Sequence, residues 1–405
     1  MKGRILVSLC LASFVSLAGC KGFWDLPPSS GSGGTTPTTL SSGVFYVLNQ
    51  TTKQIVGYSI SSGKLGTITG GTQTLPLGPY SLAIAPTGGY LYVGVPGAIY
   101  LYTIVSGGAL QGTSNSQAIY SYQGGQIPAA MVVSGSWLVD AFLLTPGVVE
   151  LDAIPISSSN GLSAVSQSNP VQSQQFNIAN ATVKQMVLSP DGDNLFVTLG
   201  AGGTIVVPFN LGNSNPLGAT ATTINVANGN AQAYSVAVDP QDRLFYIGET
   251  NANSAGTSGG LLVYDYTSLG TGIPRNAPTQ ISGSPLSSGG LAPNAILAFQ
   301  SGLNVYVANG TGNTATGNVA AFSVSVSGTT YTVAAENTIA AGIQPIGLAE
   351  DSDGNFVLAV ATGGSTSSGN PDLDAYTMSS GALTSAIQSS TGTDPVGAVA
   401  IAALP

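Results

Sequence analysis

The sequence has 405 residues, of which 43% are hydrophobic and only 6% are charged. Eight Lys and Arg stand against seventeen Asp and Glu, so the formal net charge is −9, and there is no histidine. A nucleic-acid-binding function is excluded, because too few basic side chains exist to neutralise phosphates. Catalysis with histidine as the general base, the commonest choice in enzymes, is excluded as well.

Residues 1–19 are typical of an export leader. Lys2 and Arg4 give it a positive start, and Ile5–Leu17 is an apolar stretch too short to span a bilayer. Leu17-Ala-Gly-Cys20 resembles the bacterial lipobox, in which the Cys is lipidated and becomes the first residue of the mature chain. We therefore predict a lipoprotein signal peptide with lipid attachment at Cys20. An ordinary secretory leader is the alternative.

Cleavage before Cys20 changes the charge and the thiol content of the chain. It leaves six Lys and Arg against seventeen acids, a net charge of −11, and it removes Cys10. With Cys20 lipidated, the mature chain has no free thiol and no disulfide. Lys21 follows the Cys, in place of the aspartate associated with inner-membrane retention. We predict an exported protein anchored to the cell envelope, with the outer membrane preferred and the leaflet open.

Residues 20–43 are rich in Pro, Ser, Gly and Thr and predict a flexible linker. From residue 44 to residue 405 a unit of about fifty residues repeats: a proline or its substitute, an alternating apolar strand, a tight turn and an aromatic strand. The units begin at Pro79, Pro128, Val183, Ala233, Pro293, Pro345 and Pro395, at intervals of 49, 55, 50, 60, 52 and 50 residues. Each interval has room for four short strands, the content of a propeller blade.

The last unit is split between the two ends of this region. Pro395–Ile401 has the pattern of an opening strand, and Val44–Asn49 has that of a second strand without an opening one. Their pairing would complete a blade and remove two open sheet edges. We predict an all-β fold, a seven-bladed β-propeller over residues 44–405 whose last blade is closed by the C-terminal strand.

Two second strands, Tyr46-Val-Leu-Asn49 and Tyr306-Val-Ala-Asn309, resemble the YVTN repeat of seven-bladed propellers. The segment Ser189-Pro-Asp-Gly192 is similar to the opening strands of the lactonase family, whose best-known members hydrolyse 6-phosphogluconolactone. The resemblance implies a central site with His, Arg and acidic side chains. Because the mature chain has no His and only Arg243 and Arg275, the family's catalytic residues are not assigned here.

A binding surface can be located from the repeat. In a blade the first strand starts at one rim and the second returns to it, so polar residues at these two ends converge around one mouth. One cation, two carboxylates, two aromatic rings and several amides suit a small polar or sugar-like ligand. The alternative is that the amides make side-chain-to-backbone turns and that Lys184 pairs with a nearby acid. The candidate rim residues are Asn49, Tyr80, Asp140, Lys184, Tyr234, Glu249, Asn294, Asn309 and Gln344.

The sequence favours a non-catalytic binding or interaction module that needs no metal and no cofactor. Its partners would be the membrane, through the lipid, and a small polar or sugar-like ligand or a protein, but no nucleic acid. A lactonase-like hydrolase of a sugar lactone, with Glu249 and Lys184 as its acid–base set, is the alternative. A structural surface protein with its mouth closed by loops 250–260 or 310–318 is the third possibility.

The anchor can be tested with Cys20→Ala. We expect the variant to lose incorporation of labelled palmitate and to leave the membrane fraction or remain uncleaved, because no other mature residue carries a thiol. Cys10→Ala is the matched control and should be lipidated normally. Undiminished labelling of Cys20→Ala would show that the leader is not a lipoprotein signal.

Overall fold

The computed structural model describes residues 43–61, 63–112, 118–252, 255, 258–310, 316–363, 371–389 and 394–405. The predicted leader and lipid site, and all of the linker but Gly43, lie outside the described residues. The two described helices, η1 (Ser106–Gly108) and η2 (Tyr266–Leu269), are single 3₁₀ turns. Neither they nor any other described segment forms a helix with the length and hydropathy of a membrane span.

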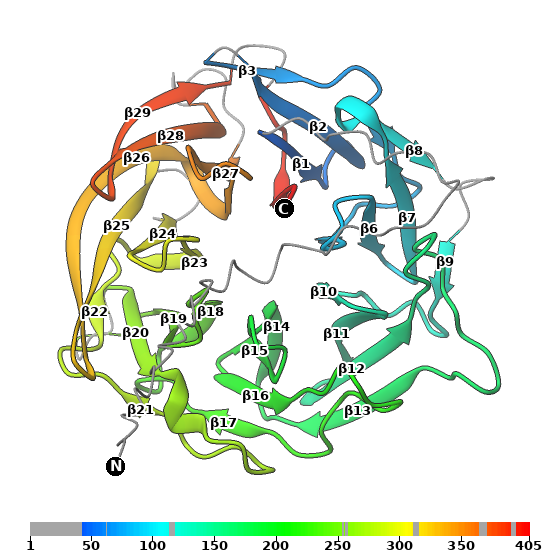
Figure 1. Ribbon diagram of the computed structural model, residues 1–405, viewed down its shortest axis with the longest axis horizontal. Helices are drawn as coiled ribbons and strands as arrows, with labels where there is room; N and C mark the ends of the chain where they lie inside the picture. Colours follow the sequence, from blue (N-terminus) through cyan, green and yellow to red (C-terminus); the bar gives the residue numbers. More distant parts are fainter. Residues whose placement is uncertain are drawn as a thin grey trace, which may run out of the picture. The chain divides into compact units, whose positions relative to one another are not determined.

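The remaining described elements are strands in five hydrogen-bonded sheets. Two of the sheets, those containing β18 and β26, hold two innermost strands each, and around every innermost strand the plan is the same, from the centre to an outer edge (Figure 1). The innermost strands are β5 (Ser81–Ile84), β10 (Ala130–Ser134), β14 (Ala181–Leu188), β18 (Gln232–Val238), β23 (Ala292–Ala298), the second half of β26 (Thr330–Glu350) and β30 (Ala398–Ala403). The second strands are β6 (Tyr90–Val95), β11 (Trp137–Thr145), β15 (Asn194–Gly200), β19 (Leu244–Thr250), β24 (Asn304–Gly310), β27 (Val357–Gly363) and β1 (Val44–Asn49).

The outer strands complete each group. The third strands are β7 (Ala98–Ile104), β12 (Val148–Pro155), β16 (Thr204–Pro208), β20 (Gly260–Asp265), β25 (Thr316–Ser327), β28 (Leu373–Ser379) and β2 (Gln54–Ser61). The edges are β8 (Leu110–Gly112), β9 (Ala118–Ser121), β13 (Gln172–Asn177), β17 (Thr222–Ile224), β21 (Thr279–Gln280), β22 (Leu286–Ser287), the first half of β26, β29 (Ala382–Gln388), β3 (Lys64–Thr67) and β4 (Gln73–Thr74). All strand pairings are antiparallel, as alternating apolar patterns and short turns favour.

The innermost strands contact one another in the order β5, β10, β14, β18, β23, β26 and β30, and β30 contacts β5 again. The ring is closed by β30, which pairs with β1 from Ala403↔Phe45 to Ala398↔Asn49. Figure 1 shows β30, in red, beside β1, in dark blue. The prediction of an all-β propeller whose last blade is closed by the C-terminal strand is confirmed.

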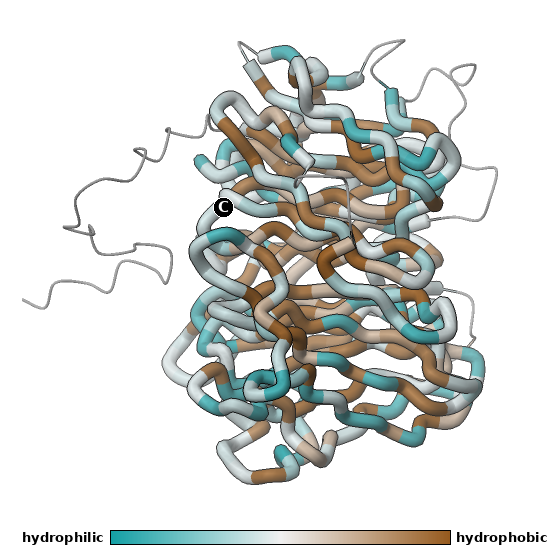
Figure 2. The backbone as a smooth tube through the Cα atoms, turned by 90° about the vertical axis from the view of Figure 1, so that its right-hand side faces the viewer, coloured by the Kyte–Doolittle hydropathy of each residue, from teal (hydrophilic) through white to brown (hydrophobic). Residues whose placement is uncertain are grey.

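The core lies between neighbouring sheets. Seven buried apolar clusters each join one sheet to the next around the ring. In β1, for example, Phe45 and Val47 pack toward β27 and β28, whereas Tyr46 and Leu48 pack toward β6. The alternation along one strand thus fills two clusters, because successive side chains point to opposite faces. Figure 2 shows the hydrophobic stretches, in brown, running across the stacked strands.

Hydroxyl groups also connect neighbouring sheets near the start of the innermost strands. Each donates a hydrogen bond to a backbone carbonyl of the next sheet. The bonds are Ser81 Oγ to Pro128 O (2.5 Å), Ser235 Oγ to Pro293 O (2.7 Å) and Thr362 Oγ1 to Ala398 O (2.9 Å). Gly94 and Gly248 lie opposite these serines. A Cβ on either would clash with the serine hydroxyl and with the proline of the next sheet to which that hydroxyl donates. Glycine is therefore required here for the close approach of two sheets.

Ring closure can be tested by deleting residues 395–405. The deletion removes β30 and the buried Leu404, and it exposes the edge of β1. We expect a loss of at least about 3 kcal/mol in the free energy of unfolding, or aggregation, because a buried Leu or Ile alone contributes 1.5–3 kcal/mol. Chemical denaturation measures the loss. Deletion of the exposed Pro405 alone is the control, and equal stability of both deletions would contradict the closure.

Candidate functional site

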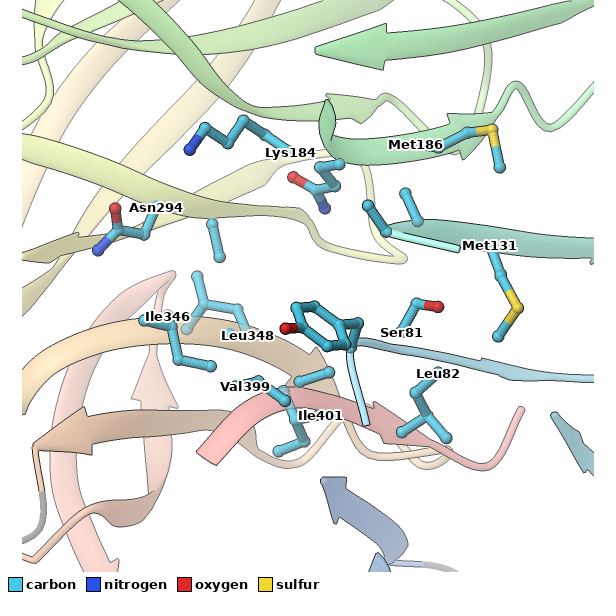
Figure 3. A pocket seen from close by; sticks show the side chains of 17 residues that line it. Ser81, Leu82, Met131, Lys184, Met186, Asn294, Ile346, Leu348, Val399 and Ile401 are labelled. Atoms are coloured by element: carbon cyan, nitrogen blue, oxygen red, sulfur yellow. The ribbon is translucent and has the colours of Figure 1, made fainter. Parts of the chain in front are cut away.

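A cavity of about 200 Å³ opens where the innermost strands begin. Six of these strands, or the residue just before them, contribute to its wall: β5, β10, β14, β23, β26 and β30. Lys184 and Asn294 lie toward one end of the cavity and Met131 and Met186 toward the other (Figure 3). The wall thus combines polar side chains such as Lys184 and Asn294 with apolar ones such as Met131 and Met186.

β-bulges place the side chains at the mouth. In β18, β23, β26 and β30 one residue near the start of the strand has no partner on the second strand: Tyr234, Asn294, Ile346 and Val399. In β14 the register shifts between Ala181 and Gln185, across Lys184. Such an extra residue bends the strand and turns its side chain out of the ladder. Lys184, Asn294, Ile346 and Val399 line the cavity as a result.

Lys184 is the one cation among the described residues that line the cavity. Its Nζ lies 4.6 Å from the centre of the Tyr234 ring, a cation–π contact. Burial lowers the pKa of Lys184, because partial removal of water disfavours the ammonium form. The aromatic ring positions the ammonium group without neutralising its charge, so an anionic or electron-rich ligand group would find it available.

The neighbouring polar groups are fixed by the backbone. Asn294 Nδ2 donates to Pro345 O (2.8 Å), and Gln185 Oε1 accepts from Val236 N (3.0 Å). Both bonds reach an adjacent innermost strand. Amides held in this way form a preorganised wall rather than adaptable arms. Tyr80 differs from them because the residue is 41% exposed.

The other predicted rim residues lie elsewhere. Gln344 has a left-handed backbone (φ 58°). Its amide lies near that of Asn294, since a Cβ on Gly310 would meet both, but Gln344 does not line the cavity. The residues that end second strands, Asn49, Asp140, Glu249 and Asn309, are buried and do not line the cavity.

Three of these buried residues hold the segment that leads into their own sheet. Asp140 accepts a 2.6 Å hydrogen bond from the Tyr122 hydroxyl, and Glu249 accepts one from Ala227 N at 2.9 Å. Asn309 Nδ2 donates to Ser288 O at 2.7 Å. The sequence predicts the end of the strand at which these residues lie. It does not predict which face of the sheet their side chains occupy.

The proposed Glu249–Lys184 set is not an ion pair. Within the part of the chain that the structure describes, only Arg243 and Asp239 form a salt bridge, at 2.6 Å, in the β18–β19 turn. That turn is at the other end of the innermost strand. Metal binding gains no support either, since no three acidic side chains among the described residues are grouped to hold an ion. Loops 250–260 and 310–318, proposed to close the mouth, lie partly outside the described residues.

The sequence analysis did not identify Ser81, Gln185 or the apolar residues of the cavity wall, such as Met131 and Met186. It considered one position per strand, whereas consecutive residues of an innermost strand, such as 80–82 and 184–186, line the cavity. The edge of such a strand faces the central space, so both of its faces contribute. The edge position of each opening strand was the signal that could have found them.

Comparisons with known proteins come from structure alone. No protein-family model matches the chain, and no curated protein matches its sequence. A candidate 6-phosphogluconolactonase from Bacteroides uniformis is similar with a TM-score of 0.63 and 15% identity, over 89% of this chain and 98% of its own. The periplasmic gluconolactonase of Pseudomonas aeruginosa gives 0.63 and 16%, over 90% and 100%. At this identity the likeness establishes a shared fold.

Glu249 makes the stability of the protein depend on pH. Burial raises the pKa of Glu249 to about 7, although the bond from Ala227 N opposes the shift. The raised pKa means that the folded state holds a proton that the unfolded state releases near pH 4.5. The stabilisation is complete below pH 4.5 and is lost as the pH rises to about 7.

We expect Glu249→Gln to reduce the fall in the free energy of unfolding between pH 4.5 and 7. The difference should be on the order of 1–3 kcal/mol. Urea denaturation at several pH values measures it, and Glu336→Gln, at an exposed position, is the control. A Glu249→Gln profile parallel to that of the wild type would show that Glu249 is ionised in the folded state throughout.

Proposed function

We propose that this chain is a lactonase-like propeller that hydrolyses a sugar lactone at the central cavity. The observation that carries the proposal is the fixed Lys184 ammonium at the mouth of a small, otherwise neutral cavity. The two similar structures described above, which cover nearly the whole chain, support the reaction class. The proposal replaces the non-catalytic module that the sequence favours.

The chemistry assigned to Lys184 is stabilisation of charge. Attack of water on the lactone carbonyl creates an oxyanion, and a positioned ammonium that donates to it lowers the barrier. Sugar lactones also open slowly in water, so this stabilisation alone would accelerate the reaction. Tyr80, at the opening, offers a hydroxyl and a ring face to the sugar. Glu249 is left out of the reaction because it does not line the cavity.

A substrate without a phosphate group fits this site best. The phosphate of a phosphorylated lactone carries close to two negative charges at neutral pH, whereas the described cavity wall contributes one cation. The whole chain carries a net charge of −9 and would repel a dianion further. We therefore propose a neutral sugar lactone, whose product is a monoanionic sugar acid.

Binding of the sugar acid without turnover is the second candidate function. The observation in its favour is that no carboxylate appears among the described residues of the cavity wall, so no acidic general base is at hand. Lys184 would then pair with the ligand carboxylate.

We also propose that the protein works at the cell envelope, anchored through Cys20. The support is the leader and the lipobox-like segment of the sequence. The anchor experiment on Cys20→Ala tests this proposal separately from the activity.

Hydrolysis of glucono-δ-lactone by the purified protein, measured against buffer in a pH-stat, tests the function. We expect turnover above the buffer rate and a loss of 10²- to 10³-fold in kcat for Lys184→Met, the usual effect of removing one oxyanion donor. Glu249→Gln should keep wild-type kcat.

Wild-type protein that leaves the buffer rate unchanged would refute hydrolysis. Calorimetry with gluconate then decides the second candidate, which requires binding by the wild type and at least tenfold weaker binding by Lys184→Met. Full turnover by Lys184→Met would remove Lys184 from the reaction.

A further inference from the structure

Exposed apolar side chains form an arc beside the cavity mouth. They belong to three neighbouring sheets, those that contain β30, β5 and β10. Each lies at or near the rim where the innermost strands begin, and each is between 37% and 49% exposed. The arc consists of Val396, Leu77, Tyr80, Ile127, Leu143 and Leu144.

Hydrogen bonds join most of the backbone segments that carry these side chains. Gln50 donates from its backbone N to Gly397 O (2.9 Å) and from Nε2 to Pro79 O (3.2 Å), which joins the segments of Val396 and Tyr80. Ser81 Oγ bonds to Pro128 O, which joins the segments of Tyr80 and Ile127. Ala129 N bonds to Ala141 O at 3.0 Å and sets Ile127 beside the end of β11, where Leu143 and Leu144 lie.

The arc runs into the cavity. Tyr80 belongs to both, and the strand next to β10 in the ring is β14, which carries Lys184. An apolar surface of several residues that leads to a single fixed cation is complementary to a molecule with a polar or anionic head and an apolar chain. Single exposed apolar residues scattered over a surface would need no explanation, but six of them on adjoining segments at one cavity mouth do.

We propose that the arc binds the apolar chain of an amphiphilic ligand whose head enters the cavity at Lys184. This inference rests on the proposed function in one respect: the substrate is then a neutral sugar lactone that carries an alkyl or acyl chain, and the product is the corresponding sugar acid.

Other occupants fit the charges less well. A bilayer surface rich in anionic lipids would be repelled by a chain with a net charge of −9. A second copy of the chain would bring the same negative charge and the same ammonium, and it would leave Lys184 without a counter-charge. A small monoanionic or neutral amphiphile meets both the arc and the ammonium.

The experiment uses the purified protein and two sets of probes. The first set is γ-butyrolactone and γ-alkyl lactones with chains of four and eight carbons, assayed for hydrolysis. The second is acetate, hexanoate and decanoate, assayed for binding by calorimetry. We expect kcat/KM and affinity to rise by at least about tenfold between the four-carbon and eight-carbon chains and between hexanoate and decanoate, roughly twofold per half-covered methylene group.

The double variant Ile127→Ser/Val396→Ser should reduce these increases to less than threefold. Both side chains are exposed, so the fold should tolerate the changes. Leu303→Ser is the matched control, since Leu303 is 55% exposed in the β23–β24 turn at the opposite end of the innermost strand, and it should retain the wild-type dependence on chain length.

The outcomes separate the two proposals. Lactone hydrolysis at equal rates for all chain lengths overturns the arc inference and leaves the proposed hydrolysis intact. Decanoate binding that needs Lys184 and the arc, without turnover of either the γ-lactones or glucono-δ-lactone, supports the amphiphile site and refutes the hydrolysis. A third outcome is that activity and binding do not depend on chain length, that the wild-type protein is a dimer and that the double variant is a monomer. This outcome identifies the arc as a contact between copies and overturns the inference.

Discussion

The pairing of β30 with β1 is the constraint on which the rest of the structure depends. Without it, the innermost strands would form an open arc with two free edges, and the apolar faces of β1 and β27 would have no cover on one side. With it, every sheet has two neighbours, and each alternating strand can bury both of its faces. The closed ring also creates the site, since Val399 and Ile401 of β30 supply part of the cavity wall.

The sequence was sufficient to predict this architecture because the pattern of each unit is local. An alternating strand, a glycine turn and a second strand can be recognised within twenty residues, and the unmatched halves at residues 44–49 and 395–401 imply the closure. The site was predicted less well. Tyr80, Lys184 and Asn294 line the cavity, whereas Glu249 and Asp140 turn inward between sheets. The facing of these residues depends on bulges and on the packing of the next sheet, and neither follows from the alternation of a single strand.

Charged residues are few, and several carboxyl groups are buried inside the protein. Burial raises the pKa of several carboxyl groups, among them Glu249, Glu350 and Asp372, each to about 7. Glu249 and Glu350 accept backbone hydrogen bonds, from Ala227 N and Gln300 N, and so tie one segment to another. In such surroundings a carboxyl group is held mainly as a hydrogen-bonding group, and its ionisation is costly. The ammonium of Lys184 differs from these carboxyl groups, because it lies at the mouth of a cavity rather than between sheets.

The strand β26 divides the ring into parts of unequal stiffness. It leaves the outer edge of one sheet, where it pairs with β25, and continues without a break as the innermost strand of the next, where it pairs with β27. The two groups of strands are therefore joined by one continuous strand that is hydrogen-bonded on both sides. The sheets of β5 and β30, in contrast, meet through side chains and a few hydrogen bonds. Slow opening motions should begin at the contact between the β5 and β30 sheets. Backbone amides of β5 and β30 should therefore exchange their hydrogens with solvent before those of β26. The wall bearing Asn294 and Ile346 would then stay fixed while the opposite wall yields to admit a ligand.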